Sequence, residues 1–213
     1  ITAWIREKEW DPLKDDLAYE KYLNETKDLP PQFGKAFDVI DTPDEVTNLV
    51  TAFLMKHKNN IKDEQELHEI DGKTRLYNMD SEPSITQRIH QIYLPIAEQM
   101  SGQKLEPTFV YGVRSYGKDS TLKPHRDRVE THAVSFSVTY SADADWDLEI
   151  EGEDLNEYKI NLKPGKSLYY NGSRYLHSRK KPYQGEEYLN FYVHYKIKST
   201  PKKVKTSSHI KMI

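Results

Sequence analysis

Two residues near the middle of the chain, His125 and Asp127, have side chains and a spacing suited to binding a metal. They stand two positions apart in "L-K-P-H-R-D-R", residues 122–128. Imidazole and carboxylate groups are both ligands for divalent metals, and side chains two apart on a strand project from the same face. A chain of 213 residues with 8 histidines contains about 0.6 His-x-Asp triplets by chance. A charged surface turn is therefore an equal alternative unless a third ligand is found.

The third candidate ligand is His177, which lies in "S-R-Y-L-H-S-R", residues 173–179. It follows "K-P-G-K-S-L-Y-Y-N-G", a segment that is predicted to form a strand. Two histidines and one carboxylate on one face form the facial triad of mononuclear non-haem iron(II), which leaves positions open for a chelating co-substrate and oxygen. The chain has no cysteine, which excludes disulfides, thiol nucleophiles and thiolate metal sites. A surface histidine and a solvent-exposed His–Asp pair are the alternatives.

The overall composition indicates a folded domain with a heavily solvated surface. Mean hydropathy is −0.85 and 31% of the residues are charged, yet the chain holds 15 Tyr and 6 Phe, and disordered chains are usually poor in aromatic residues. The net charge of −3 gives no strong nucleic-acid signal. The C-terminal tail, residues 198–213, is rich in lysine and has no acid, and a solvated end is favoured over a contact with phosphate or an acidic partner.

The sequence shows no targeting or membrane signal. No segment is apolar enough over a sufficient length to span a bilayer, and the N-terminus lacks the apolar core of a signal peptide. We therefore expect no membrane partner and a cytoplasmic location. The chain does not begin with Met, so a missing N-terminal segment stays an open alternative.

The first hundred residues are predicted to be mainly helical. Thr42 is expected to cap a helix, with Pro43 at its first position and acids in its first turn. The apolar residues that recur at helical spacing in this segment are Val46, Leu49, Val50, Phe53 and Leu54. A second helix is predicted over residues 84–100, which Pro95 should kink or end. Residues 59–80 between the two helices are polar and are expected to be irregular.

From Pro107 onward the hydrophobic period changes to the alternation of strands. The predicted strands cover residues 108–116, 131–140, 146–151, 158–162, 167–171 and 188–195. Many short strands in so few residues indicate a sandwich or a barrel, and helices followed by a sheet indicate an α+β fold whose helices back one sheet. The metal-binding segment is then placed just before the strand at 131–140, with His125 and Asp127 on one side.

Residues 37–195 resemble the iron(II)/2-oxoglutarate-dependent oxygenases, especially their prolyl-4-hydroxylase-like branch. "F-D-V-I-D-T-P-D-E-V-T-N-L-V" is similar to the strand and helix that open that domain, and "V-R-S-Y-G-K-D-S-T-L-K-P-H-R-D" to its tyrosine-glycine-spacer-H-x-D segment. "W-D-L-E-I-E" stands where the family has a Gly-Gly-x-Leu-type strand. "L-K-P-G-K-S-L-Y-Y-N-G-S-R-Y-L-H-S-R" matches the family's Pro-x-x-Gly strand and its distal histidine.

This resemblance implies an α+β fold built on a double-stranded β-helix, a cupin-like jelly roll with N-terminal supporting helices. It implies an N-terminal extension at residues 1–36, a catalytic domain at 37–197 and a basic tail at 198–213. Within the catalytic domain, helical support would cover residues 37–104 and the jelly roll residues 105–197.

The resemblance also implies roles for particular residues. His125, Asp127 and His177 would hold the iron. Tyr116 falls where a tyrosine of the branch hydrogen-bonds 2-oxoglutarate, and a tyrosine that only packs in the core is the alternative. The implied cofactors are Fe(II), 2-oxoglutarate as co-substrate and O2, with ascorbate as a further candidate. The implied reaction hydroxylates an unactivated C–H bond and decarboxylates 2-oxoglutarate to succinate.

One position departs from the family's pattern. The family usually places Arg or Lys shortly after the distal histidine, where it pairs with the C5 carboxylate of 2-oxoglutarate. The matching segment here is "Q-G-E-E-Y", so Glu187 takes that position. A buried carboxylate must be paired with a cation. We favour Arg179 for this role and Arg128 next, with Lys181 and Arg114 as further candidates.

Three functions compete at this point. The first is hydroxylation of a protein or peptide side chain, with proline as the leading substrate by family analogy alone. The second applies the same chemistry to a free amino acid, a small metabolite or a nucleobase, the last of which would need a stacking platform and a phosphate-binding groove. The third is a jelly-roll binding module with a vestigial metal site, which Glu187 favours. His194 is expected to be structural, and His132 to belong to the core or line the site.

Overall fold

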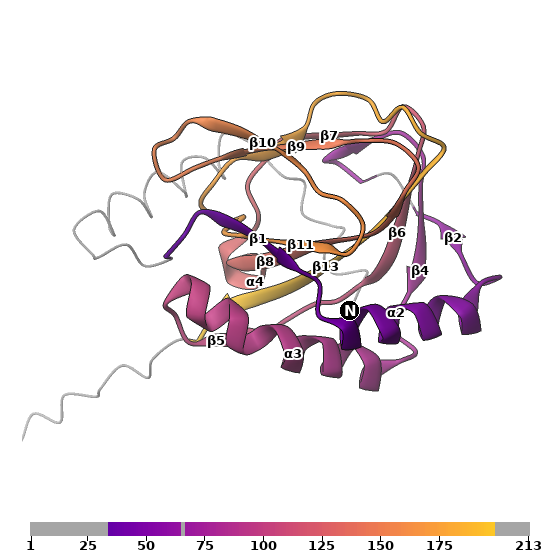
Figure 1. Ribbon diagram of the computed structural model, residues 1–213, viewed down its shortest axis with the longest axis horizontal. Helices are drawn as coiled ribbons and strands as arrows, with labels where there is room; N and C mark the ends of the chain where they lie inside the picture. The colour runs from indigo at the N-terminus through magenta and orange to yellow at the C-terminus, as the bar shows by residue number, and fades with distance from the viewer. Residues whose placement is uncertain (1–33, 65–66, 199–213) are drawn as a thin grey trace, which may run out of the picture.

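The structure is a computed structural model that describes residues 34–64 and 67–198. Its strands form two sheets that face each other, and two long helices cover the outer side of the larger sheet (Figure 1). In spatial order the larger sheet contains β1 (Phe37–Asp41), β11 (Lys166–Tyr170), β8 (Val134–Ala142), β13 (Glu187–Ile197), β6 (Gly112–Gly117), β4 (Thr74–Asn78) and β2 (Lys62–Asp63), with β5 (Leu105–Pro107) paired to β13. The smaller sheet contains β10 (Glu157–Asn161), β9 (Asp147–Glu151), β12 (His177–Arg179), β7 (Thr121–His125) and β3 (Ile70–Asp71). The helices are α2 (Asp44–His57), α3 (Pro83–Ser101) and the short α4 (Val129–His132).

This topology is the jelly roll that the sequence predicts. From β6 onward the chain passes back and forth between the sheets, with β6, β8, β11 and β13 in the larger one and β7, β9, β10 and β12 in the smaller one. The strand pairs that connect these elements are antiparallel. The predicted α+β fold, a double-stranded β-helix with N-terminal supporting helices, is therefore confirmed.

Alternation along β8 shows how the larger sheet uses its two faces. Val134, Phe136 and Val138 are buried and belong to the core that includes the helices. The helix residues of this core are Val46, Val50, Phe53, Ile89, Tyr93 and Ala97. Because successive side chains of a strand point to opposite faces, the intervening residues face the smaller sheet. These intervening side chains are Ser135, Ser137 and Thr139.

The helices differ from their prediction in detail. Pro43, predicted at the first helical position, is the N-cap of α2, and no side chain caps that helix. The hydroxyl of Thr42 instead lies 2.8 Å from Ser167 Oγ, because Thr42 directly follows β1, which pairs with β11. α3 runs through Pro95 to Ser101, so that proline does not end the helix.

Residues 59–80, which were predicted to be irregular, contain β2, β3 and β4. β4 pairs with β6 in the larger sheet, and β3 pairs with β7 in the smaller one. The prediction was wrong because these strands are short and polar, and their partners lie far away in the sequence. Strand formation depends on such partners more than on intrinsic preference.

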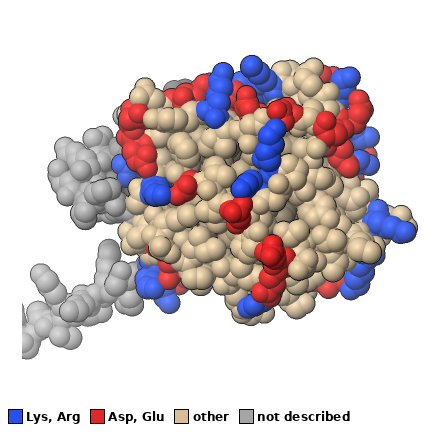
Figure 2. Space-filling model, in the orientation of Figure 1, with Lys and Arg blue, Asp and Glu red and all other residues tan. Residues whose placement is uncertain are grey.

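The ends of the chain contribute little to this description. The predicted extension (1–36) and basic tail (198–213) lie almost entirely outside the described residues, and the domain limits stay a prediction. In the described ranges no helix combines the length and apolarity needed to cross a membrane. On the face that Figure 2 shows, acidic and basic side chains are interspersed.

Tyr93 joins α3 to β11 through a buried hydrogen bond. It is fully buried, and its hydroxyl lies 2.6 Å from Ser167 Oγ. We expect Tyr93→Phe to lower the free energy of unfolding by about 1–2 kcal/mol because Ser167 loses a partner away from water. Urea denaturation measures this change. As a control, Tyr158→Phe removes an exposed hydroxyl that bonds to Asp154 and should cost less than about 0.5 kcal/mol; equal losses would contradict the prediction.

Candidate metal centre

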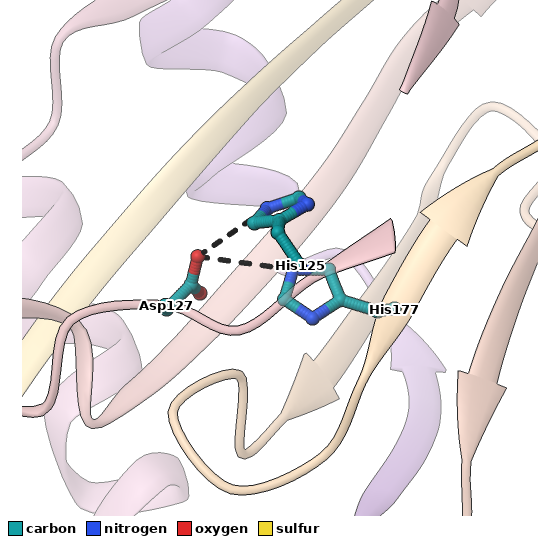
Figure 3. A group of neighbouring side chains, drawn as sticks. All are labelled: His125, Asp127 and His177. Atoms are coloured by element: carbon teal, nitrogen blue, oxygen red, sulfur yellow. Dashed lines mark ion pairs between the residues drawn. The ribbon is translucent and has the colours of Figure 1, made fainter. Parts of the chain in front are cut away.

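The pairing of β7 with β12 brings the predicted metal ligands together. His177, at the start of β12, is the direct partner of His125, at the end of β7. Because opposite residues of an antiparallel pair point to the same face, both rings share one side of the smaller sheet. Asp127 lies in the loop that follows and points back toward both rings (Figure 3). The prediction that a strand follows this segment was wrong at its start, since residues 129–132 form α4.

The three donor groups converge on one point. Asp127 Oδ1 lies 3.7 Å from His125 Nε2 and 3.7 Å from His177 Nε2. The ligand atoms of the three residues all lie within 4.8 Å of one another. Donors that bind one divalent ion through bonds of about 2.1 Å are about 3–4 Å apart, so the arrangement suits a single metal. The structure thus brings the predicted ligands together, while their binding of iron stays a prediction.

Hydrogen bonds behind the two rings determine the tautomer of each imidazole. His125 Nδ1 lies 2.8 Å from the carbonyl oxygen of Lys123, and His177 Nδ1 lies 3.1 Å from that of Tyr175. A carbonyl oxygen only accepts, so Nδ1 carries the hydrogen and Nε2 presents its lone pair. Burial lowers the pKa of His177 well below its ordinary value, and the neighbouring His125 adds to this effect. His177 is therefore neutral at pH 7, which is the form that binds a metal.

Asp127 is the charged member of the set. Its Oδ2 is buried and receives no hydrogen bond from the described residues. Burial raises the pKa of this carboxyl group, and His125 partly offsets the effect. An ionised carboxylate that has left water needs a cation or hydrogen-bond donors. A divalent cation between Asp127 Oδ1 and the two Nε2 atoms would supply the missing charge, so the donor set fits iron(II).

The loop between β11 and β12 places Gly172 directly against this aspartate. The backbone amide of Asp127 donates to the carbonyl oxygen of Gly172 at 2.9 Å. A Cβ atom added to Gly172 would lie 2.1 Å from Asp127 Oδ2, a distance that real contacts do not reach. The absence of a side chain at Gly172 therefore allows the carboxylate to take its place beside the histidines.

Arg179, the favoured co-substrate anchor, lies on β12 two residues after His177 and is only 2% exposed. Its Nη1 donates to the carbonyl oxygen of Trp146, and its Nη2 donates to the hydroxyl of Tyr188 at 2.9 Å. The guanidinium carbon lies 4.5 Å from the Trp146 ring centroid and 4.8 Å from that of Tyr188. Among the described residues, no carboxylate pairs with Arg179. This buried cation therefore has room in its hydrogen-bonding capacity for an anion.

The other candidate cations are less suited to anchor a co-substrate. Arg114 already forms a two-pronged pair with Glu64, at 2.6 and 2.9 Å. Arg128, the second choice, is exposed and is the N-cap of α4. Lys181 is also exposed. Since a buried and unpaired cation gains most from an anionic ligand, the geometry favours Arg179 over these three.

Glu187, the departure from the family's pattern, points away from the space between the sheets. Its carboxylate accepts hydrogen bonds from Ser115 Oγ at 2.7 Å and from Arg75 Nη2 at 3.0 Å. Ser115 is the direct partner of Leu189, which belongs to the core on the helix side. Ser115, Leu189 and Glu187 thus share the outer face of the sheet. The neighbouring inward side chain on β13 is Tyr188, so Glu187 neither anchors nor repels a ligand between the sheets.

Tyr116, the predicted co-substrate tyrosine, belongs to the aromatic cluster around Arg179. Its ring centroid lies 5.3 Å from that of Trp146 and 6.2 Å from that of Tyr188. Its hydroxyl lies 3.1 Å from the hydroxyl of Tyr192. The structure therefore places Tyr116 and Arg179 in one region, and it adds three residues that the sequence reasoning had assigned to packing or had not singled out. The signal for two of them was alternation in "Y-L-N-F-Y-V-H-Y", which puts residues 188, 190, 192 and 194 on one face.

The contact between Gly172 and Asp127 predicts a loss of metal affinity without a loss of fold. Because φ at Gly172 lies outside the left-handed region, alanine is compatible with its backbone, but its methyl group would displace the carboxylate. We expect Gly172→Ala to weaken Mn(II) binding about 10- to 100-fold, as measured by titration calorimetry.

A second glycine provides the control for this substitution. A Cβ atom at Gly117 would lie 3.4 Å from its nearest neighbour, the carbonyl oxygen of Lys73, which is an ordinary contact. Gly117→Ala should keep the metal affinity of the wild type. Unchanged Mn(II) binding by Gly172→Ala at an unchanged melting temperature would show that the glycine has no such role.

Comparisons with known proteins give structural but no sequence matches. No family model matches the chain, and no curated protein matches it. A prolyl hydroxylase from Trichoplax adhaerens, solved with a peptide fragment of the hypoxia-inducible factor oxygen degradation domain, has a TM-score of 0.57 at 14% identity, covering 90% of this chain and 94% of that one. An oxidoreductase of the 2OG-Fe(II) oxygenase family from Burkholderia pseudomallei has a TM-score of 0.54 at 12% identity, covering 84% and 89%.

A third similar structure acts on a different kind of molecule. HygX from Streptomyces hygroscopicus, solved with nickel, 2-oxoglutarate and hygromycin B, has a TM-score of 0.56 at 12% identity, covering 83% of this chain and 86% of that one. Prolyl hydroxylases recur among the similar structures, in agreement with the resemblance seen in the sequence. At these identities the likeness concerns the fold: this chain has the double-stranded β-helix of the 2-oxoglutarate/Fe(II) oxygenases, prolyl hydroxylases among them.

Proposed function

We propose that this protein is an iron(II)- and 2-oxoglutarate-dependent dioxygenase that hydroxylates an unactivated C–H bond. The observation that carries the proposal is the convergence of His125 Nε2, His177 Nε2 and Asp127 Oδ1 at separations of 3.7 Å. The hydrogen bonds on both Nδ1 atoms leave the Nε2 lone pairs free for a metal. Two imidazoles and one carboxylate leave open positions on the ion, as a chelating co-substrate and oxygen require.

Arg179 supports 2-oxoglutarate as the co-substrate. The C5 carboxylate of 2-oxoglutarate needs a cation at the far end of the molecule from the metal. Arg179 lies on the same strand as His177, is buried, and has no carboxylate partner among the described residues. Tyr116 and Tyr188 add hydroxyl groups to the same region. We assign the C5 carboxylate to Arg179, with Tyr116 as a second hydrogen-bond donor.

Polar side chains on the larger sheet also support a polar ligand between the sheets. Ser137 and Asn190 face the smaller sheet, and Asn190 Nδ2 donates to Ser137 Oγ at 3.0 Å. Asn190 Oδ1 is buried and forms no hydrogen bond with the described residues. Buried polar atoms usually have partners, so a hydrogen-bonding ligand in this space accounts for them better than an apolar core does.

When bound, iron(II) with 2-oxoglutarate supplies the oxidation of a C–H bond by O2 together with conversion of 2-oxoglutarate to succinate and carbon dioxide. The chain's own residues contribute position and environment. His125 and His177 present neutral donors, Asp127 supplies the charge, and Arg179 orients the co-substrate. The enclosing sheets keep water away from the reacting atoms.

The substrate class is a finer part of the proposal. We favour a prolyl residue of a protein or peptide, because prolyl hydroxylases recur among the similar structures and one of them was solved with a peptide. HygX, solved with hygromycin B, makes a small molecule the second candidate. A binding module with a vestigial metal site is the third, and Glu187 no longer favours it, since its side chain lies on the outer face of the sheet.

Succinate release tests the proposed chemistry. Purified protein with Fe(II), 2-oxoglutarate and ascorbate should release succinate slowly without substrate, and omission of Fe(II) should abolish the release. Asp127→Ala removes the charged ligand, and we expect the rate to fall at least about 100-fold with loss of bound metal. If the wild type binds no Fe(II) and releases no succinate, the protein is a binding module instead.

The co-substrate anchor has a separate test. Arg179→Met keeps the length of the side chain but removes its charge, so the C5 carboxylate loses its charge-assisted hydrogen bonds. We expect the KM for 2-oxoglutarate to rise about 10- to 100-fold. Arg114→Met is the matched control, because Arg114 is already paired with Glu64, and it should change the KM less than about threefold. The reverse order of effects would move the anchor to Arg114.

A further inference from the structure

A wall of aromatic rings lies beside the metal centre, on the side opposite Arg179. The centroids of His132 and His194 are 4.0 Å apart. Tyr111 stacks on His132 at 6.2 Å with an interplanar angle of 18°, and Tyr192 stacks on His194 at 5.9 Å with an angle of 10°. Phe109 extends the stack, 5.1 Å from Tyr111. We define these five residues as the aromatic wall.

Strand pairing places this wall near the metal ligands. The ring of Tyr170 lies 5.0 Å from the ring of His177. Tyr170 is the direct partner of Ser135, and Ser135 is the direct partner of His194. The three form one row across the inner face of the larger sheet, where neighbouring strands are about 4.8 Å apart. His194 is therefore about 10 Å along this row from a residue that contacts a metal ligand.

The row of inward side chains on β13 separates two regions. Tyr188, at one end, contacts Arg179. His194, at the other end, contacts His132, which follows Asp127 by five residues through the short helix α4. A co-substrate anchored at Arg179 would thus occupy one side of the metal. The aromatic wall remains for the molecule to be oxidised.

The wall is uncharged and held in place by hydrogen bonds. Burial lowers the pKa of His194 well below its ordinary value, and burial also lowers that of His132. Burial raises the pKa of Tyr111 to about 12. Ser135 Oγ lies 2.8 Å from His194 Nδ1, and the Tyr111 hydroxyl lies 3.3 Å from His132 Nε2. The wall therefore presents neutral ring faces in a fixed arrangement.

We propose that the aromatic wall is the primary substrate subsite and that it selects an uncharged ring, such as the pyrrolidine of a prolyl residue, over a charged chain. A saturated or aromatic ring gains contact with ring faces, whereas a charged group would leave water without an ion partner at the wall. His194 Nε2 forms no hydrogen bond with the described residues, and it is available to a polar group next to the bound ring. This inference rests on the proposed oxygenase function for the position of the reacting atom.

Binding measured without turnover tests the wall independently of catalysis. The protein is loaded with Zn(II) and 2-oxoglutarate, and saturation-transfer NMR measures the affinity of acetylated and amidated Ala-X-Ala peptides in which X is Pro, Phe, Lys or Asp. We expect the Pro or Phe peptide to bind at least about fivefold more tightly than the Lys and Asp peptides. Equal affinities, preference for a charged peptide, or no binding by any of the four would overturn the inference.

Variants of His194 separate a role in binding from a role in folding. His194→Ala should weaken the preferred peptide about 3- to 10-fold, and His194→Phe, which keeps a ring, should retain most of the affinity. His57→Ala removes a histidine ring that packs on Phe53 in α2, away from the wall, and it should leave peptide affinity unchanged. Equal losses in the Phe and Ala variants of His194 would refute selection by ring contact. Absence of succinate release with intact peptide selectivity would refute the oxygenase function alone.

Discussion

The site depends on one buried carboxylate, that of Asp127, and on the strand pairing that surrounds it. Its two imidazole neighbours come from β7 and β12, and they meet only because His125 and His177 are direct partners. A shift of one residue in this pairing would turn one ring to the opposite face of the sheet. The metal centre is thus a property of the jelly-roll register, and the loop at Gly172 completes it by leaving room for the carboxylate.

The sequence predicted the fold class and the three metal ligands because both depend on local patterns. Alternating apolar residues identify strands, and the family's ordered segments locate His125, Asp127 and His177. Features that depend on distant partners were not predictable in the same way. Residues 59–80 form strands only through pairing with β6 and β7. The orientation of Glu187 depends on the register of β13, in which a position one residue away faces the opposite side.

Charge pairing decides between the two buried arginines near the metal. In the sequence, Arg114 and Arg179 are equivalent candidates. In the structure, Glu64 neutralises Arg114 across 50 positions of sequence, whereas Arg179 contacts a carbonyl oxygen, a hydroxyl and two ring faces. Ring faces and neutral oxygens compensate a guanidinium only in part. An unpaired buried cation and the unpaired buried oxygen of Asp127 then lie on neighbouring elements, which is the charge pattern that a metal with a dianionic co-substrate would complete.

An irregularity in β8 links this charge pattern to the stability of the fold. Ser135, Ser137 and Thr139 face inward, and simple alternation would continue with Ser141. The pairing with β13 instead skips one residue, so that Ala142 is opposite the inward-facing Tyr188. The skipped residue is Tyr140, whose hydroxyl lies 3.0 Å from that of Thr51 on α2. Such bulges redirect a strand beside functional sites. Here the bulge turns a tyrosine toward the supporting helix and a small alanine toward the Arg179 cluster, so the same local distortion fastens the helix and leaves space where the co-substrate is proposed to bind.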